Sequence, residues 1–190
     1  MKLFRGLAAN EPDRYLPNLA LCLNNFGALH FKRKDYSVAD AAWVEALEIR
    51  RALPSGSESY LSDLFTSLGN LGLVRKEMGH MDSACRLYDE ALVICERRMQ
   101  TEPGAIVDLT RTQGWMALCL ASMPEARREA LEYAQRAAAN LEKASGIPPG
   151  SGCRTPPPRR GSTPSNQPGR IAVRDADTAP PVLLFARDAA

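Results

Sequence analysis

The chain has few of the residues on which catalytic and metal sites depend. Its 190 residues include two histidines and five cysteines. The cysteines form no CxxC pair and have no histidine at metal-ligand spacing, so neither a zinc site nor a disulfide framework is expected. We expect free thiols that behave as small buried apolar groups. GxSxG, HExxH and glycine-rich phosphate loops are missing as well, and we therefore expect neither an enzyme nor a cofactor.

The chain also lacks a strong net charge and long apolar runs. Its net charge is +2, from 24 Lys+Arg and 22 Asp+Glu. Residues 147–190 contain six Arg and three Asp, a net of +3, so residues 1–146 carry 2 − 3 = −1. This balance makes nucleic acid binding by the first part unexpected. No run is long enough to span a bilayer, and Arg5 and Gly6 interrupt any apolar signal core. A cytoplasmic protein is expected.

Proline divides the chain into two regions. Nine of the fourteen prolines lie between Pro148 and Pro181, where a helix cannot persist. Residues 147–190, rich in Pro, Gly and Arg, are therefore predicted to be a flexible, disordered C-terminal tail. Val182 to Phe185 form a short apolar patch near its end. That patch is either a docking peptide for a partner or an unselected terminus.

Residues 1–146 contain apolar residues at helical spacing in copies that lie 45 residues apart. Steps of three and four residues predict amphipathic helices. The matching positions are Leu16, Leu19, Leu23 and Phe26, then Leu61, Leu64, Leu68 and Leu71. Each copy is predicted as a pair, helix A and helix B. The predicted ranges are 16–32 and 36–53, then 61–77 and 81–99, with turns at Lys34-Asp35 and Gly79-His80.

Small residues and one aromatic also recur in each copy. The sets are Gly27, Ala39, Trp43 and Ala46, then Gly72, Ala84, Tyr88 and Ala91. A glycine inside a helix costs up to about 1 kcal/mol relative to alanine, so something must offset it. Close approach of helix B to Gly27 and Gly72 is the expected reason. The aromatic shares one face with the alanines and is predicted to fill the space between hairpins.

A third, eroded copy follows the first two. Its matching residues are Leu109, Met116, Ala117, Ala130 and Ala137, with Ala134 at the aromatic position. Ser122 and Glu125 predict a capping box at the start of its helix B. At the other end, residues 1–7 match the last turns of a helix B and predict a preceding unit. The predicted repeats are about 15–53, 60–99 and 105–145.

The order of glycine, alanines and aromatic resembles the tetratricopeptide repeat (TPR). The period of 45 rather than about 34 residues, with Asn25-Phe26-Gly27 and Asn70-Leu71-Gly72, is similar to the long-period TPRs of kinesin light chains. The proline that commonly ends helix B is replaced by Arg51 and Glu96. The resemblance implies an all-α fold, an α-solenoid of antiparallel helix pairs in a right-handed superhelix, whose A helices line a concave groove.

The resemblance also implies which residues line the groove. They include Asn24, Asn25, Lys32, Asn70, Leu73, Lys76 and Trp115, and to these we add the basic residue Arg111. The asparagines can hold a peptide backbone or bond locally. The basic side chains can attract acidic ligands or remain solvated. Trp115 is either a contact that contributes strongly to binding or a residue that packs the last hairpin.

These patterns predict a protein-interaction module that binds a peptide or protein segment as an adaptor, scaffold or sensor. Neither a small-molecule substrate nor a membrane is expected. The alternative is a helical-repeat nucleic acid binder that uses the basic tail. A pairing of Asp35 with His80 across two turns remains open. Glu45 and Glu90 are predicted to be exposed or to form ion pairs along their own helices with Arg50 or Arg97.

Overall fold

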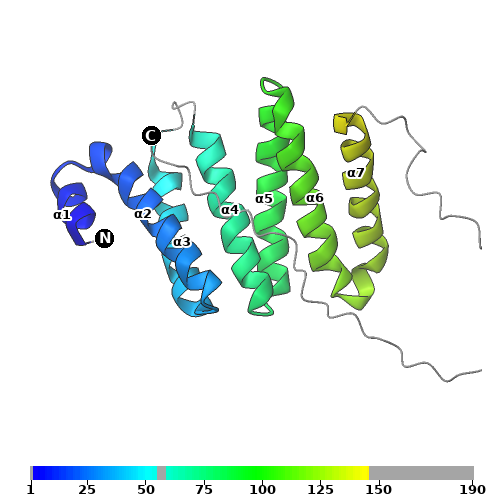
Figure 1. Cartoon of the computed structure of the whole chain (residues 1–190), viewed down its shortest axis with the longest axis horizontal. Helices are drawn as coiled ribbons and strands as arrows, with labels where there is room; N and C mark the ends of the chain where they lie inside the picture. The colour runs from blue at the N-terminus through cyan, green and yellow to red at the C-terminus, as the bar shows by residue number, and fades with distance from the viewer. Residues whose placement is uncertain (1, 55–58, 146–190) are drawn as a thin grey trace, which may run out of the picture.

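The computed structural model describes residues 2–54 and 59–145, which form seven α-helices and two short 3-10 turns. The predicted tail and its apolar patch lie outside these residues. In chain order the elements are α1 (Lys2–Asn10), α2 (Pro12–Lys32), α3 (Tyr36–Ala52), α4 (Tyr60–Glu77), α5 (Met81–Met99), η1 (Pro103–Ala105), α6 (Ile106–Ala121), η2 (Pro124–Ala126) and α7 (Arg127–Ser145) (Figure 1).

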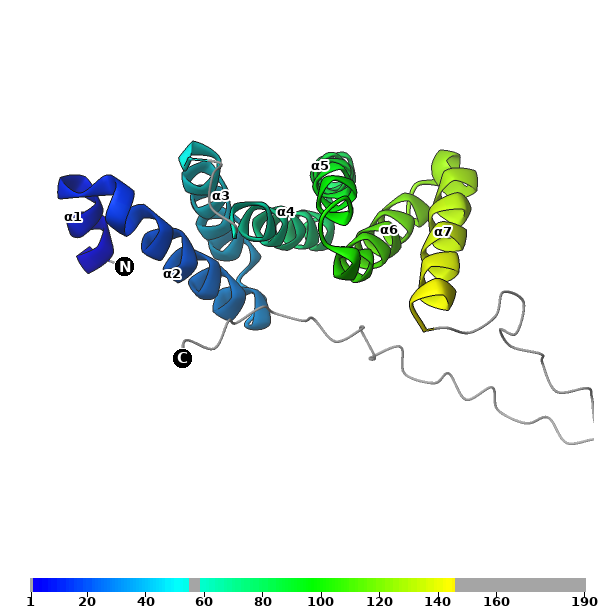
Figure 2. The same ribbon diagram turned by 90° about the horizontal axis from the view of Figure 1, so that it is seen from above.

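The helices stack in chain order as adjacent antiparallel pairs. Each packs mainly on the helix before and after it in the chain, and α2 also touches α4. Seen from above, α2, α4 and α6 lie in one layer and α3, α5 and α7 in the other (Figure 2). The predicted all-helical repeat fold is therefore confirmed. Helix α2 begins at Pro12 rather than Leu16, because the first turn of a helix tolerates proline.

Both predicted turns end a helix in the same way. Lys34 and Gly79, which are 45 residues apart, have φ angles of 65° and 82°. After each of them the chain closes a backbone bond to the preceding helix, from Asp35 N to His30 O at 2.9 Å and from His80 N to Arg75 O at 2.8 Å. This is the Schellman arrangement, in which a left-handed residue satisfies the last carbonyl groups of a helix.

The side chains at these turns pair locally rather than across hairpins. His30 Nδ1 lies 3.0 Å from Asp35 Oδ2 within the first hairpin. The pairing of Asp35 with His80 is therefore not formed, because the Schellman turn brings Asp35 back beside His30 of its own pair.

Within the core of the first two hairpins, an aromatic ring of helix B packs directly on a glycine of helix A. Trp43 and Tyr88 are fully buried. A Cβ atom at Gly27 would lie 2.6 Å from Trp43 Nε1, and one at Gly72 would overlap the Tyr88 ring. The expected close approach is confirmed, and the approaching group is the ring itself. Trp43 Nε1 donates a hydrogen bond to the Asn24 carbonyl at 3.0 Å, so its one polar group is satisfied.

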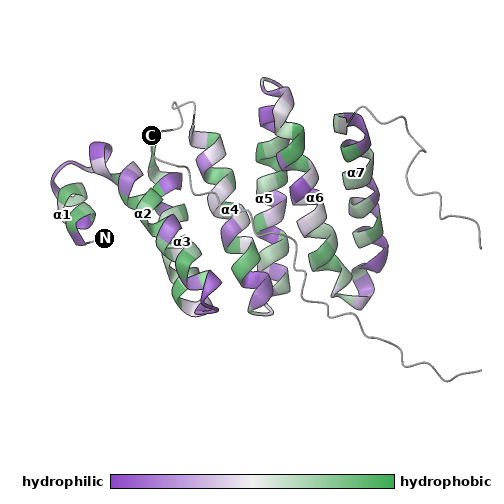
Figure 3. Ribbon diagram, viewed as in Figure 1, coloured by the Kyte–Doolittle hydropathy of each residue, from purple (hydrophilic) through white to green (hydrophobic). Residues whose placement is uncertain are grey.

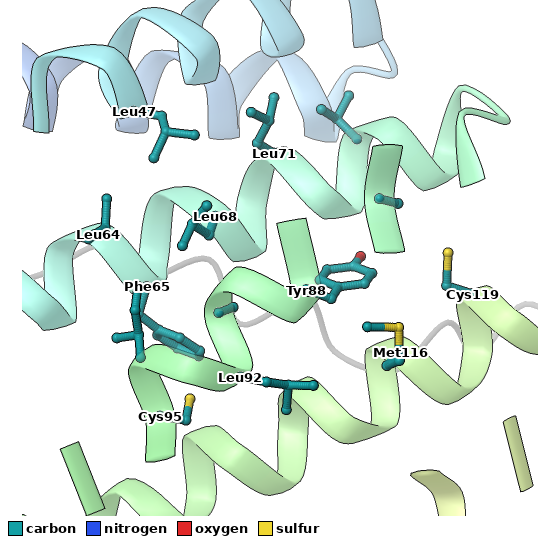
Figure 4. Close-up of a cluster of buried hydrophobic side chains, with 14 of the residues drawn as sticks. Leu47, Leu64, Phe65, Leu68, Leu71, Tyr88, Leu92, Cys95, Met116 and Cys119 are labelled. Atoms are coloured by element: carbon teal, nitrogen blue, oxygen red, sulfur yellow. The ribbon is translucent and has the colours of Figure 1, made fainter. Parts of the chain in front are cut away.

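The apolar core runs continuously from the first hairpin to the third. Hydrophobic residues recur along every helix of the stack (Figure 3). Leu47 of α3 belongs to the same buried cluster as Leu68 of α4, Leu92 of α5 and Met116 of α6 (Figure 4). Stacked repeats are stabilised in this way, because each hairpin buries its apolar face against its neighbours.

The capping box predicted for the third hairpin is wrong. Ser122 is the residue after α6, and its Oγ donates to the Cys119 carbonyl at 2.5 Å. Met123 precedes the 3-10 turn, and no side chain caps that turn. The hydroxyl therefore satisfies a carbonyl at the end of one helix rather than an N–H at the start of the next.

Glu45 and Glu90 form ion pairs with arginines of neighbouring helices rather than of their own helix. Arg5 of α1 pairs with Glu45 of α3 at 2.6 Å, and Arg51 of α3 pairs with Glu90 of α5 at 2.5 Å. The expected pairs within one helix are wrong, because stacking brings equivalent helices within reach. Helix α1 also packs on α2 and α3 through Phe4 and Ala8. It lies where a preceding helix B would lie, but the preceding unit remains a prediction.

Candidate functional site

A small pocket opens on the layer formed by the A helices. Its volume is about 80 Å³, and four helices line it. Leu21 and Asn24 come from α2, Arg50 from α3, Ser62, Asp63, Phe65 and Thr66 from α4, and Asp108 from α6. Leu21 and Thr66 are equivalent in the 45-residue register, as are Asp63 and Asp108. The repeat therefore brings the same face of three successive A helices to one site.

Arg50 forms one wall of this pocket. It is only 5% exposed, and its Nη1 donates to the Asp63 carbonyl at 2.7 Å and to Ser67 Oγ at 2.5 Å. Burial lowers the pKa of Arg50, and the Asp63 carboxylate opposes that effect. A guanidinium keeps its proton under such conditions. The wall is therefore a fixed cation tied to the first turns of α4.

Asp108, on the far side of the pocket, is held by two arginines. Arg98 donates to Asp108 and to Glu102, each at 2.7 Å. Burial alone would lower the pKa of Arg98, but the hydrogen bonds to the two carboxylates outweigh it, and the pKa is raised. Arg111 also pairs with Asp108. The Asp108 charge is thus largely neutralised within the fold.

Arg111 also lies against two aromatic rings. Its guanidinium carbon is 5.6 Å from the ring centroid of Phe65 and 5.6 Å from that of Trp115. Cation–π contact and an ion pair together fix the position of this side chain. The predicted attraction of Arg111 for an acidic ligand is therefore weakened by Asp108.

The two asparagines that are equivalent in the register have different surroundings. Asn25 is exposed, whereas Asn70 is buried and its Nδ2 donates to Asn24 Oδ1 at 2.9 Å. Asn24, itself buried, is the one member of the predicted groove set that lines the pocket. Asn70 therefore joins α4 to α2, and Asn25 remains accessible on the surface.

The other predicted groove residues are spread along the layer. Lys32 is exposed at the end of α2, and Lys76, which is half-buried near the end of α4, pairs with Glu77 at 2.9 Å. The register equivalent of Lys76 is Phe31 rather than Lys32. Leu73 is half-buried on α4. Lys32 and Lys76 lie toward one end of the layer, while Arg111 lies toward the other.

Trp115 packs between the second and third hairpins. It is half-buried, and its ring lies 6.4 Å from Phe65 and 5.7 Å from Tyr88 between centroids. A Cβ atom at Gly69 would lie 2.8 Å from the Trp115 ring. These contacts favour the packing interpretation of Trp115 over that of a free binding contact.

Sequence reasoning missed most of the pocket. Glu45 was expected to be exposed or to pair with Arg50, yet Arg50 bonds to residues of the next hairpin. A signal was present in the register, because Arg50 and Ser67 are equivalent to Cys95 and Thr112. In the structure Cys95 Sγ lies 3.9 Å from Thr112 Oγ1. This contact joins α5 to α6 in the way that Arg50 and Ser67 join α3 to α4. Pairs at this offset therefore mark contacts from a helix B to the next helix A.

Comparison with known families agrees with this architecture. A tetratricopeptide repeat model of the kinesin-light-chain type matches residues 19–53 and 64–101. The chain carries tetratricopeptide repeats, and the resemblance found in the sequence is confirmed. The matched segments are the first and second hairpins, α2–α3 and α4–α5.

A bacterial protein of known structure shares the fold over most of this chain. The crystal structure of BtubC (BKLC) from P. vanneervenii matches with a TM-score of 0.55 and 20% identity, covering 76% of this chain and 54% of that one. The present chain thus spans about half the length of that protein. No curated protein matches the sequence. Among the residues that the structure describes, no helix has the length and apolar character needed to cross a bilayer.

Proposed function

We propose that this repeat array is a protein-interaction module that binds an extended peptide segment along the layer of α2, α4 and α6. The observation that carries the proposal is the pocket, which draws residues from three successive A helices. Tetratricopeptide repeats imply protein–protein interaction, and stacked helical repeats present extended surfaces to their ligands. An adaptor, scaffold or sensor role follows from such binding. No reaction is proposed for the pocket.

The chemistry of the pocket suits one small side chain of such a peptide. Phe65 offers an aromatic surface, Asn24 an amide, and Asp63 a half-buried carboxylate near the Arg50 cation. A volume of about 80 Å³ limits what can enter. Asn25 and Lys32 are exposed on the same layer and are proposed to contact the peptide backbone and acidic side chains beyond the pocket.

The test compares two matched substitutions on opposite layers. Leu21→Arg places a long cation in the pocket mouth on α2, whereas Val93→Arg places the same cation on α5. Leu21 is 38% exposed and Val93 is 65% exposed, so neither change disturbs the core. Partners captured by the full chain are identified, and their affinity for each variant is then measured by titration.

We expect Leu21→Arg to weaken binding at least about tenfold. Loss of a contact at the centre of an interface costs more than about 1.4 kcal/mol of binding free energy, which is a factor of about ten in Kd. Val93→Arg should bind as the parent chain does. Circular dichroism and the melting temperature should be unchanged in both variants. Equal affinity for parent and Leu21→Arg chains, with Asn25→Ala also unaffected, would refute binding on this layer.

A further inference from the structure

Two thiols meet at the junction between the second and third hairpins. Cys85 Sγ of α5 lies 3.2 Å from Cys119 Sγ of α6. Cys119 is fully buried, while Cys85 is half-buried. Cys119 Sγ also lies 3.5 Å from the Met81 carbonyl oxygen and 3.9 Å from Met81 Sδ. Cys119 therefore projects from α6 toward the first turns of α5 (Figure 4).

The 45-residue register shows that this position connects hairpins. Cys85 is equivalent to Asp40 of α3. Asp40 forms a bidentate ion pair with Arg75 of α4, the next helix A. The Cys85 contact partner, Cys119, lies one residue before the register equivalent of Arg75. The first junction is thus joined by an ion pair, and the second has a pair of sulfur atoms in its place.

We infer that Cys85 and Cys119 form a thiol–disulfide exchange site that can join α5 covalently to α6. The sulfur atoms are in contact, and bond formation requires them to approach to about 2.05 Å. The contact lies between two rigid helices, which holds the thiols together and favours an intramolecular product over a bond to another chain.

The chemical step needs a small disulfide such as oxidised glutathione. The Cys85 thiolate attacks one sulfur of that disulfide, forms a mixed disulfide and expels one glutathione thiolate, which takes up a proton. The Cys119 thiolate then attacks the Cys85 sulfur, forms the bond between the two cysteines and expels the second glutathione. Two protein thiols are oxidised, and one glutathione disulfide is reduced to two thiols.

The surroundings assign different roles to the two cysteines. Cys85 is the accessible member and therefore the point of entry, whereas buried Cys119 is the resolving thiol. Burial, together with the hydrogen bond to Cys119, raises the pKa of the Cys85 thiol to about 12. Thiolate is consequently scarce at neutral pH, and exchange is expected to be slow. The bond closes over hours in a redox buffer rather than on mixing.

The test uses the full chain with Cys22→Ser and Cys153→Ser, which leaves Cys85, Cys95 and Cys119. The native protein is equilibrated in oxidised and reduced glutathione, quenched with acid and mapped by mass spectrometry. We expect a cross-linked pair of peptides containing Cys85 and Cys119, lost on treatment with dithiothreitol. A Cys95→Ala variant serves as the matched control, because Cys95 is buried beside Thr112, and it should form the same cross-link.

Two results would overturn the inference. One is a folded chain in which Cys85 stays as a stable mixed disulfide with glutathione. The other is a folded chain in which both thiols remain reduced across the whole range of buffers. Circular dichroism on the same samples establishes that the chain is folded, so either result bears on the thiol pair itself.

Discussion

At the scale of single residues, contacts between a glycine and an aromatic ring set the distance between the two helices of a hairpin. The Trp43 ring packs on Gly27, and the Tyr88 ring packs on Gly72. The Tyr88 hydroxyl is buried without a hydrogen-bond partner among the residues that the structure describes, and burial raises its pKa. A ring therefore fills this site even though its polar atom is left unsatisfied, which indicates that shape rather than hydrogen bonding selects the residue.

Gly72→Ala is expected to destabilise the chain by roughly 1–3 kcal/mol, because the added methyl overlaps the buried Tyr88 ring and overpacking outweighs the gain in helix propensity. Gly114→Ala on α6 is the control. An added Cβ there meets no atom of the described residues within 4 Å, so it should stabilise by up to about 1 kcal/mol. Urea unfolding of both variants measures the difference. A stabilised Gly72→Ala chain would contradict the packing argument.

The aromatic contacts could be anticipated from the sequence, but the polar contacts could not. The shared spacing of Gly27 and Trp43 with Gly72 and Tyr88 indicated close packing, because steric fit depends on residue size at fixed offsets. Arg50 has several acceptors within the reach of its long side chain, so its partner depends on how the hairpins stack. Its bonds to Asp63 and Ser67 required the structure.

At the scale of elements, a left-handed residue follows both α2 and α4 at the point where the chain reverses. Gly79 adopts φ 82° without steric cost, whereas Lys34 adopts φ 65° with a side chain. A non-glycine residue in this conformation is disfavoured by about 1 kcal/mol or more. The first hairpin therefore contains a local strain that the second lacks.

Lys34→Gly is expected to stabilise the chain by up to about 1 kcal/mol, because relief of the left-handed strain exceeds the extra chain entropy of glycine. Lys34→Ala is the matched control, since it removes the same exposed side chain but keeps the Cβ atom, and it should give no such gain. Thermal unfolding followed by circular dichroism measures both. Equal stability of the two variants would argue against strain at this turn.

Element boundaries were predictable where periodicity and a turn coincide, as at Lys34-Asp35 and Gly79-His80. Boundaries were less predictable where one side chain can cap either the end of one helix or the start of the next. Ser122 can accept from an N–H or donate to a carbonyl, and only its place relative to α6 decides between these. The same limit applies to Glu45 and Glu90, whose partners lie on neighbouring helices.

At the scale of the whole molecule, each helix contacts mainly the helices before and after it in the chain. The free energy of local unfolding is therefore expected to differ along the stack. In an array of this kind, stability is the sum of the terms for each repeat and for each junction. The described part of α7 has two buried side chains, Ala130 and Ala137, while Leu131 and Leu141 are exposed at 58% and 60%. Helix α7 is therefore bound less firmly than α4 or α5, which have neighbours on both sides.

Native-state hydrogen exchange should reveal this gradient. We expect amides of α7 and α1 to exchange at least about tenfold faster than those of α4 and α5, because end helices open without breaking the central junctions. Exchange followed by mass spectrometry of peptides from each helix measures the rates. Uniform protection across all helices would show that the chain unfolds as one unit instead.

The groove set remains a prediction, and the contacts that its members make within the fold could not be predicted from the sequence. The repeat register identifies which helix face recurs, and Asn24 of that face lines the pocket. The register does not show which residues of that face are covered by neighbouring helices. Asn70 and Trp115 are drawn into contacts with Asn24, Phe65 and Tyr88, whereas Asn25 remains exposed.

The two tryptophans are intrinsic fluorophores at two separate positions in the stack. Trp43 is fully buried within the first hairpin, and Trp115 is half-buried between the second and third. Because the chain has no other tryptophan, its intrinsic fluorescence comes from two separate positions along the stack. Replacing one tryptophan with phenylalanine leaves a signal from the other, so opening at each end of the array can be followed by emission without an added dye.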